Sequence, residues 1–148
     1  MTTSPRPTAA ESQILCWRRA FPGHESELGQ MRRWLTWMLP ECTARDDVIA
    51  VATELSANAI QHSASGRGGT FTVEVCWRGG LVRLTVADSG GRTRPHLINE
   101  PMSEQGRGLV IVSSLSLRAG TCRDHGRRLV WAEVPWTGPS SEPPMGFP

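Results

Sequence analysis

The segment from residue 70 to residue 88 constrains the fold most, because it predicts two adjacent strands joined by a tight turn. Strand-favouring residues run from 70 to 78 and again from 81 to 88. Gly79 and Gly80 separate the two runs, and a two-residue glycine connection suits a primed hairpin turn. The sequence therefore predicts an antiparallel hairpin close to the middle of the chain.

Two amphipathic helices are predicted before this hairpin. The first covers residues 25–39 and is closed by Pro40. The second covers residues 44–62, with Thr43 as a candidate cap and acidic residues in the favoured first turn. Apolar residues recur at spacings of three and four in both. Their stripes are Leu28, Met31, Leu35, Met38 and Leu39 in the first, and Val48, Val51, Ala52, Leu55 and Ala59 in the second.

Further strands and a third helix are predicted on either side of these elements. A strand over residues 12–20 is broken by the turn at residues 21–23, and a helix starts near Gly108. A closing pair of strands covers residues 117–123 and 127–134. The order is β-α-α-β-β-loop-α-β-β. It predicts an α+β fold in which about three helices cover one face of a mixed, mostly antiparallel sheet.

Length and composition predict one globular domain with short tails. Of the 148 residues, 39% are hydrophobic and 20% are charged, which is typical of a globular chain. Residues 1–11 and 137–148 are rich in Pro, Ser, Thr and Gly, so we expect flexible tails around a domain at 12–136. The formal net charge is only +2, so no direct nucleic-acid binding is expected.

The cysteines and the apolar runs predict a soluble cytoplasmic protein. The four cysteines are widely spread and lack the spacing of metal ligands. Cys16 and Cys76 lie in apolar runs, which favours reduced, buried thiols. The sequence shows no signal-peptide core and no apolar stretch of the length that a membrane span needs, so no membrane contact is expected.

Glu54, Asn58 and His62 are four residues apart in the second predicted helix, so they lie along one line of its surface. At about 100° per residue, this line follows the flank of the apolar stripe, where it would face the edge of a cleft. A carboxylate can act as a general base, and an amide oxygen suits Mg²⁺. Taken alone, the three residues favour an ordinary polar helix flank.

Two glycine-containing segments add possible ligand contacts. Residues 88–91 end a strand with an acid, which can accept a bond from an exocyclic amine, although the segment is also a good turn. Residues 106–109 lie where an irregular loop, residues 89–105, becomes a helix. A glycine-rich helix start can bind phosphate. Arg107 could add charge there or project outward.

The order and spacing of these three segments together resemble the GHKL class of ATPases and kinases, which includes histidine-kinase catalytic domains, Hsp90, DNA gyrase and MutL. Residues 54–62 look like its N box, 88–90 like its first glycine box and 106–109 like its second. The short length, the turn at residues 21–23 and the Asn-Ala-x-x-His ending resemble anti-sigma regulatory factors of the RsbW and SpoIIAB type. The resemblance covers residues 12–136.

The resemblance implies an ATP-binding α/β sandwich that uses Mg²⁺ and phosphorylates a serine or threonine on an anti-sigma-factor antagonist. It also implies a homodimer that sequesters a sigma factor. Glu54 would be the base that activates the acceptor hydroxyl, Asn58 would ligate Mg²⁺, and Asp88 would bind the adenine amino group. Residues 91–105 would form the lid. The remaining nucleotide-binding positions would be Gly90, Gly106, Arg107, Gly108, Leu109 and His62. His62 could equally cap the helix end or pack against it.

The sequence departs from the class pattern D-x-G-x-G at one position, where Arg92 replaces the second glycine. This departure leaves a second interpretation open, a catalytically silent module that binds ATP or only a partner protein. Glu54 and Asn58 favour the kinase, because sequestration of a partner needs neither a base nor a metal ligand. Arg92 favours the silent module.

Overall fold

The computed structural model of the protein describes residues 14–62, 68–88 and 107–138. Its elements follow the predicted order, apart from the segment between the third strand and the third helix, which lies outside the described residues. They are β1 (Leu15–Pro22), α1 (Glu27–Met38), α2 (Thr43–His62), β2 (Thr70–Arg78), β3 (Leu81–Ala87), α3 (Arg107–Leu115), β4 (Arg118–Asp124) and β5 (Arg127–Pro135).

The five strands form one sheet in the order β1-β2-β3-β5-β4, and all four pairings are antiparallel. The mostly antiparallel sheet is thus confirmed, with no parallel pair among the described strands. The central hairpin is also confirmed, since Arg78 pairs with Leu81 across the two glycines. Gly79 has a φ of 58°, a left-handed conformation that fits the first central position of a type II′ turn.

The closing hairpin is confirmed to within one residue at each end. Asp124 pairs with Arg127, which leaves His125 and Gly126 as a two-residue turn. Their φ values of 49° and 78° are both positive, as a type I′ turn requires. This turn sets the register of β4 against β5.

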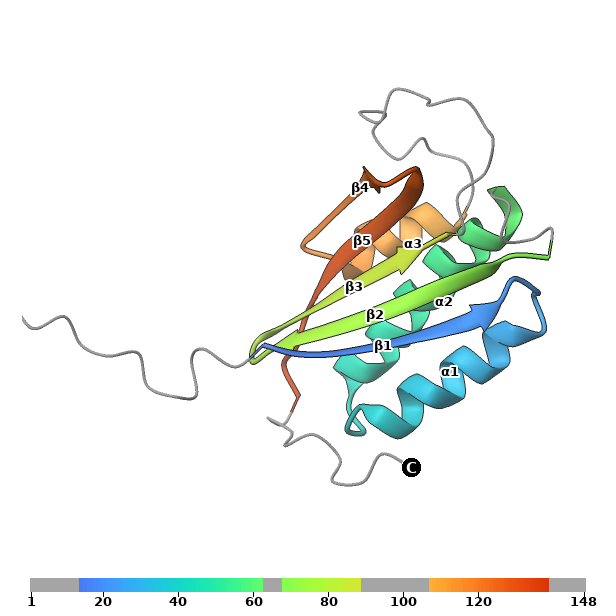
Figure 1. Cartoon of the computed structure of the whole chain (residues 1–148). Helices are drawn as coiled ribbons and strands as arrows, with labels where there is room; N and C mark the ends of the chain where they lie inside the picture. Colours follow the sequence, from blue (N-terminus) through green and yellow to red (C-terminus); the bar gives the residue numbers. More distant parts are fainter. Residues whose placement is uncertain (1–13, 63–67, 89–106, 139–148) are drawn as a thin grey trace, which may run out of the picture.

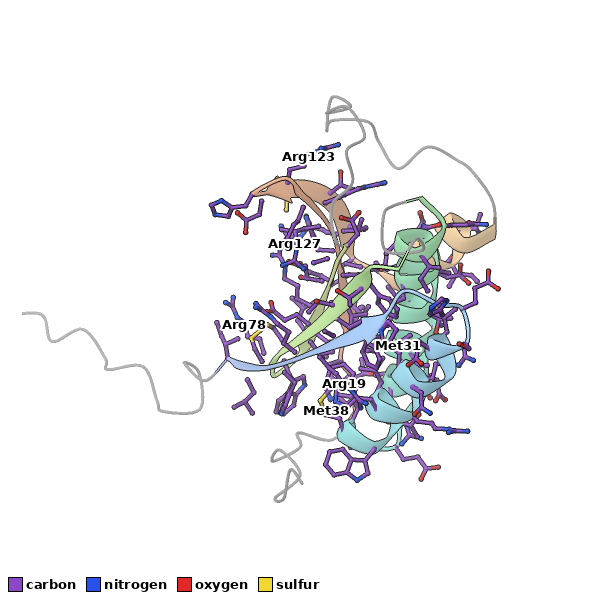
Figure 2. All side chains as sticks on the ribbon, turned by 45° about the vertical axis from the view of Figure 1, so that its right-hand side comes forward. Arg19, Met31, Met38, Arg78, Arg123 and Arg127 are labelled. Carbon is purple, nitrogen blue, oxygen red and sulfur yellow. A yellow bond between two sulfur atoms is a disulfide. The ribbon has the colours of Figure 1, made fainter. Side chains whose placement is uncertain are left out.

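The three helices lie on one face of the sheet, with α2 between α1 and α3 (Figure 1). The predicted apolar stripe of α2 is confirmed, because Val48, Val51, Ala52 and Leu55 are fully buried. Met31 and Met38 of α1 are directed toward the sheet, whereas Arg78 and Arg127 lie on its other side (Figure 2). The inward positions of β2 and β3 complete the core: Val73, Val75, Val82, Leu84 and Val86.

The first strand runs farther than predicted. Phe21 was expected to start a turn, but it pairs with Phe71 in the sheet and is almost completely buried. The two rings stack with their centroids 5.4 Å apart, and the Phe21 ring also meets Trp34 edge-on. This long-range packing extends the strand to Pro22. The second helix begins at Thr43, one residue before the predicted start, so Thr43 belongs to the helix.

The prediction of reduced, buried thiols is wrong for two cysteines. Cys16 and Cys76 form a disulfide that joins β1 to β2. They lie directly opposite each other, and the alternation of the strands places them on the face away from the helices, because their neighbour Trp17 packs toward the core. Cys42, which is half-buried, and the exposed Cys122 are free.

The predicted tails lie outside the described residues, apart from Thr137 and Gly138. The predicted lid and the glycine box at residues 88–90 lie outside them too, except for Asp88. None of the described helices is both long enough and apolar enough to span a membrane.

Candidate functional site

Three elements that carry predicted site residues meet at one end of the molecule. The C-terminal end of α2, the end of β3 and the start of α3 all lie at the upper right of Figure 1. Helix α2 contacts both β3 and α3. The fold therefore brings the residues around Asn58, Asp88 and Arg107 to one end of the sheet.

The side of α2 on which Glu54 lies follows from the helix geometry. Arg45 Nη1 donates to the backbone oxygen of Thr36 at 3.3 Å, so Arg45 marks the side of α2 that faces α1. Glu54 comes nine residues later, which at 100° per residue places it about 180° around the helix from Arg45. Asn58 lies one turn beyond Glu54. Both residues therefore lie on the side of α2 that faces α3.

Glu54 and Asn58 are half-buried side chains without partners in the part of the chain that the structure describes. Neither makes a hydrogen bond or an ion pair there, although partial burial of a carboxylate costs solvation free energy. Half-buried polar groups that no described protein group satisfies are candidates for ligand contacts. The structure thus presents a carboxylate and an amide, one turn apart, on the same side of α2.

Asp88 is held in place by β5. Its side chain is only 6% exposed, and Oδ1 accepts a hydrogen bond from the backbone N–H of Arg128 at 3.1 Å. Its own backbone N–H donates to the Arg128 oxygen, also at 3.1 Å. The Arg127 guanidinium donates through Nε to the Asp88 carbonyl oxygen at 3.1 Å. The carboxyl group is therefore fixed just beyond the last residue of β3, on the face that the helices cover.

The contact between Asp88 and β5 was not predicted from the sequence. Arg128 is forty residues away along the chain, and it contributes a backbone N–H that any residue except proline would have. No pattern of neighbouring residues indicates that Asp88 and Arg128 are in contact. Only the register of β3 against β5, in which Ala87 pairs with Leu129, places the two groups together.

The start of α3 supplies backbone N–H groups at the same end of the molecule. The helix begins at Arg107 and has no acidic residue in its first turn. The first N–H groups of a helix lack intrahelical partners and attract anions. Of the predicted phosphate-binding positions, Arg107, Gly108 and Leu109 lie in this first turn, and Gly106 lies outside the described residues. His62 is the last residue of α2.

One described donor, the Asn58 amide, fits a metal ion that is shared with nucleotide phosphates. No group of three or more His, Cys, Asp or Glu side chains that could hold a metal occurs among residues 14–62, 68–88 and 107–138. Mg²⁺ commonly takes only one or two protein ligands and completes its shell with water and substrate phosphates. The amide oxygen of Asn58 is a hard donor of that kind.

Comparison with known families agrees with this geometry. The model of the histidine kinase-like ATPase domain matches residues 21–132, which run from the end of β1 into β5. No individual curated protein matches the chain. The matched segment contains α2, β3 and α3, the three elements of the candidate site. The chain therefore belongs to the histidine kinase-like ATPase family of ATP-binding domains.

Proposed function

We propose that the protein is a cytoplasmic ATP-dependent protein kinase that phosphorylates a serine or threonine on an anti-sigma-factor antagonist and, as a homodimer, sequesters a sigma factor. The observation that carries the proposal is the pair of polar side chains Glu54 and Asn58, which lie on the α3 side of α2 without a partner among the described residues. Family membership supports the use of ATP. The resemblance of the N box and glycine boxes to anti-sigma regulatory factors supports the choice of substrate.

Asp88 would recognise adenine. A carboxylate offers about four acceptor sites, so it can receive the adenine amino group while it holds the Arg128 N–H. Its fixed position also means that little conformational entropy is lost on binding. Gly90, just beyond the described residues, would let the base approach closely.

The phosphates would lie toward the start of α3. Gly106, Arg107, Gly108 and Leu109 would bind them through backbone N–H groups and the charge of the arginine. Asn58 would hold Mg²⁺ together with the phosphate oxygens, and the ion would neutralise the charge that moves to the leaving group. His62 would lie at the end of the same helix, where nucleotide contact and helix capping are both compatible with its position.

Glu54 would act as the general base. As the acceptor hydroxyl oxygen attacks the γ-phosphorus, its proton passes to the Glu54 carboxylate and ADP leaves with the electron pair of the broken P–O bond. Glu54 has no ion-pair partner in the described part of the chain, so its carboxylate is available for the proton.

A catalytically silent ATP-binding or protein-binding module is the second candidate. Arg92 favours it, because it stands where the family pattern has a glycine close to the nucleotide. The two candidates share Asp88 and Asn58 and differ in what Glu54 does. A silent module would not need its carboxylate.

Two measurements test these functions. Calorimetric titration of ATP with Mg²⁺ should show binding to the wild-type protein, and Asn58→Ala should weaken it. Absence of binding to either protein would instead indicate a nucleotide-free interaction module. Phosphotransfer to a co-purified antagonist should stop in Glu54→Gln while ATP binding persists. Glu41→Gln, which changes an exposed carboxylate before α2, is the matched control and should transfer phosphate normally.

A further inference from the structure

A groove of about 500 Å³ lies between β1 and α1. This side of the molecule is remote from the candidate site, because β1 is the sheet edge opposite β4 and α1 lies on the other side of α2 from α3 (Figure 1). Its lining residues are Trp17, Trp34, Trp37, Arg18, Arg19, Arg33 and Gln30. The Arg18 side chain pairs with Glu74 on the other face of the sheet, so Arg19 and Arg33 are the basic side chains on the helix side. None of the described residues that line it is acidic.

The positive charge of the groove is only partly compensated. Arg18 pairs with Glu74 at 2.6 Å, whereas the Arg19 guanidinium lies 5.0 Å from the centre of the Phe21 ring. Neither Arg19 nor Arg33 has an ion-pair partner among the described residues. Trp37 is 51% exposed on the same wall. The groove thus presents apolar rings and positive charge to solvent.

The edge of β1 that pairs with no strand among the described residues borders this groove. The Cα atoms of Cys16 and Cys76 are 4.1 Å apart, the close approach of a non-hydrogen-bonded pair. Because such pairs alternate along the strand, Cys16, Arg18 and Ala20 direct their backbone N–H and C=O groups away from β2. The Gly23 N–H bond to Gly69, at 2.9 Å, fits the same alternation. These outward groups are positioned to pair with another strand.

We propose that the groove and the β1 edge bind an acidic, extended segment of a partner protein as an additional strand. Its backbone would pair with Cys16, Arg18 and Ala20, and every second side chain would face the groove. Apolar side chains there would contact the tryptophans, while carboxylates would pair with Arg19 and Arg33.

Charge argues against the other occupants. A second copy paired through the same edge would place Arg19 and Arg33 of both copies along one seam, and like charges across strands are destabilising. Arginines alone could protect the edge from aggregation, but protection does not need a groove lined with tryptophan. Single-stranded nucleic acid also binds aromatic and basic grooves, but it would leave the outward N–H and C=O groups of β1 without a pairing strand.

The probe for this proposal is a fluorescein-labelled peptide of nine residues that alternates glutamate and leucine, with both ends capped. Fluorescence anisotropy should show that it binds the full-length protein and that the lysine–leucine version does not. Methylation of alternate backbone nitrogens on one edge of the peptide should weaken binding at least about tenfold for the edge that pairs with β1. Absence of binding by the glutamate peptide, or equal binding by all versions, would overturn the proposal.

Matched variants locate the binding surface. Arg33→Glu should lower the affinity for the glutamate peptide at least about tenfold. Arg32→Glu, an equal charge change outside the groove, should change this affinity less than about twofold. Ala20→Pro removes an outward N–H without removing a bond to β2 and should also weaken binding. Circular dichroism and ATP titration check that each variant is folded.

Three outcomes would point to another explanation and reject the acidic segment. Equal losses in Arg32→Glu and Arg33→Glu would indicate net charge alone. Tighter binding of a labelled oligo-dT than of the peptide would indicate a nucleic-acid groove. A wild-type dimer that dissociates in Ala20→Pro would indicate that a second copy occupies the edge.

Discussion

The two flanks of α2 each face another helix, but they differ in how completely their side chains are buried and paired. On the α1 side the interface is closed: Leu35 and Met31 are fully buried, and even the Ser56 hydroxyl is enclosed. On the α3 side, Glu54 and Asn58 remain half-buried and without partners in the described chain. One flank of α2 therefore contributes packing free energy, while the other keeps polar groups available for a ligand.

The elements on the two sides of α2 also differ in how firmly they are held. Strands β1 and β2, on the α1 side, are joined covalently by the Cys16–Cys76 disulfide. On the other side, Val112 is the one residue of α3 in the buried core among those described. Elements with few buried apolar contacts open more easily, and binding sites are commonly built from them. The following changes test whether the two sides are energetically distinct.

Removal of the disulfide should have the largest effect on stability. Cys16 and Cys76 are separated by 60 positions, and closing a loop of that length removes chain entropy worth about 4 kcal/mol from the unfolded state. We expect the double Cys→Ser variant to lose about that much free energy of unfolding in urea titrations. ATP binding under native conditions should persist, because the site lies on the other side of α2. Loss of ATP binding in the folded variant would contradict the separation of the two sides.

The same disulfide tests the proposed cytoplasmic location. Disulfides are rare in cytosolic proteins, where glutathione keeps thiols reduced. Rapid alkylation of cells followed by mass spectrometry measures the state of Cys16 directly. An unmodified, disulfide-bonded pair in the cell would contradict an ordinary cytoplasmic location, and an alkylated pair would support it.

A buried leucine on the α1 side should matter more than a buried valine on the α3 side. Leu35→Ala removes a fully buried side chain, and changes of this kind cost about 2–5 kcal/mol. Val112→Ala removes two methyl groups rather than the three carbons that Leu35→Ala removes, so we expect a smaller cost of about 1.5–2 kcal/mol. Chemical denaturation of both variants measures the difference. Equal losses would show that the α3 side is as tightly packed as the α1 side.

Exchange of the Asp88 carboxylate for an amide should lower the affinity for ATP more than it lowers the free energy of unfolding. Asp88→Asn keeps an oxygen for the Arg128 N–H but replaces the other oxygen with a donor that cannot receive the adenine amine. We expect ATP affinity to fall by about tenfold to a hundredfold, or about 1.4–2.8 kcal/mol. Asp46→Asn, on the exposed start of α2, is the matched control. Unchanged calorimetric affinity in Asp88→Asn would remove this residue from the site.

Local signals predicted the elements well because turns and helix stripes are encoded by neighbouring residues. Gly79 and Gly80 specify a hairpin without help from the rest of the chain, and the α2 stripe follows directly from helical spacing. The family match at residues 21–132 agrees with that prediction. Within the candidate site, the spacing of Glu54 and Asn58 was sufficient to place both on one flank of a helix.

Contacts between distant segments could not be predicted in the same way. The stacking of Phe21 on Phe71 extends β1, and the pairing of Cys16 with Cys76 turns two expected core thiols into a surface disulfide. Both depend on the register of β1 against β2, which no local residue pattern specifies.

The smallest expected effect concerns a hydroxyl enclosed on the packed side of α2. Ser56 is 0% exposed, and its Oγ has no hydrogen-bond partner in the described structure. It lies eleven residues after Arg45, about 20° from it around the helix, and so belongs to the flank that faces α1. An unsatisfied buried hydroxyl costs free energy, and alanine also favours helix more than serine does. Ser56→Ala should therefore stabilise the protein by about 1 kcal/mol in urea titrations.

Ser114→Ala, at an exposed position of α3, controls for helix propensity and should gain about 0.5 kcal/mol or less. A destabilised Ser56→Ala would mean that the hydroxyl has a partner in solution, and that this flank of α2 is less closed than its packing indicates.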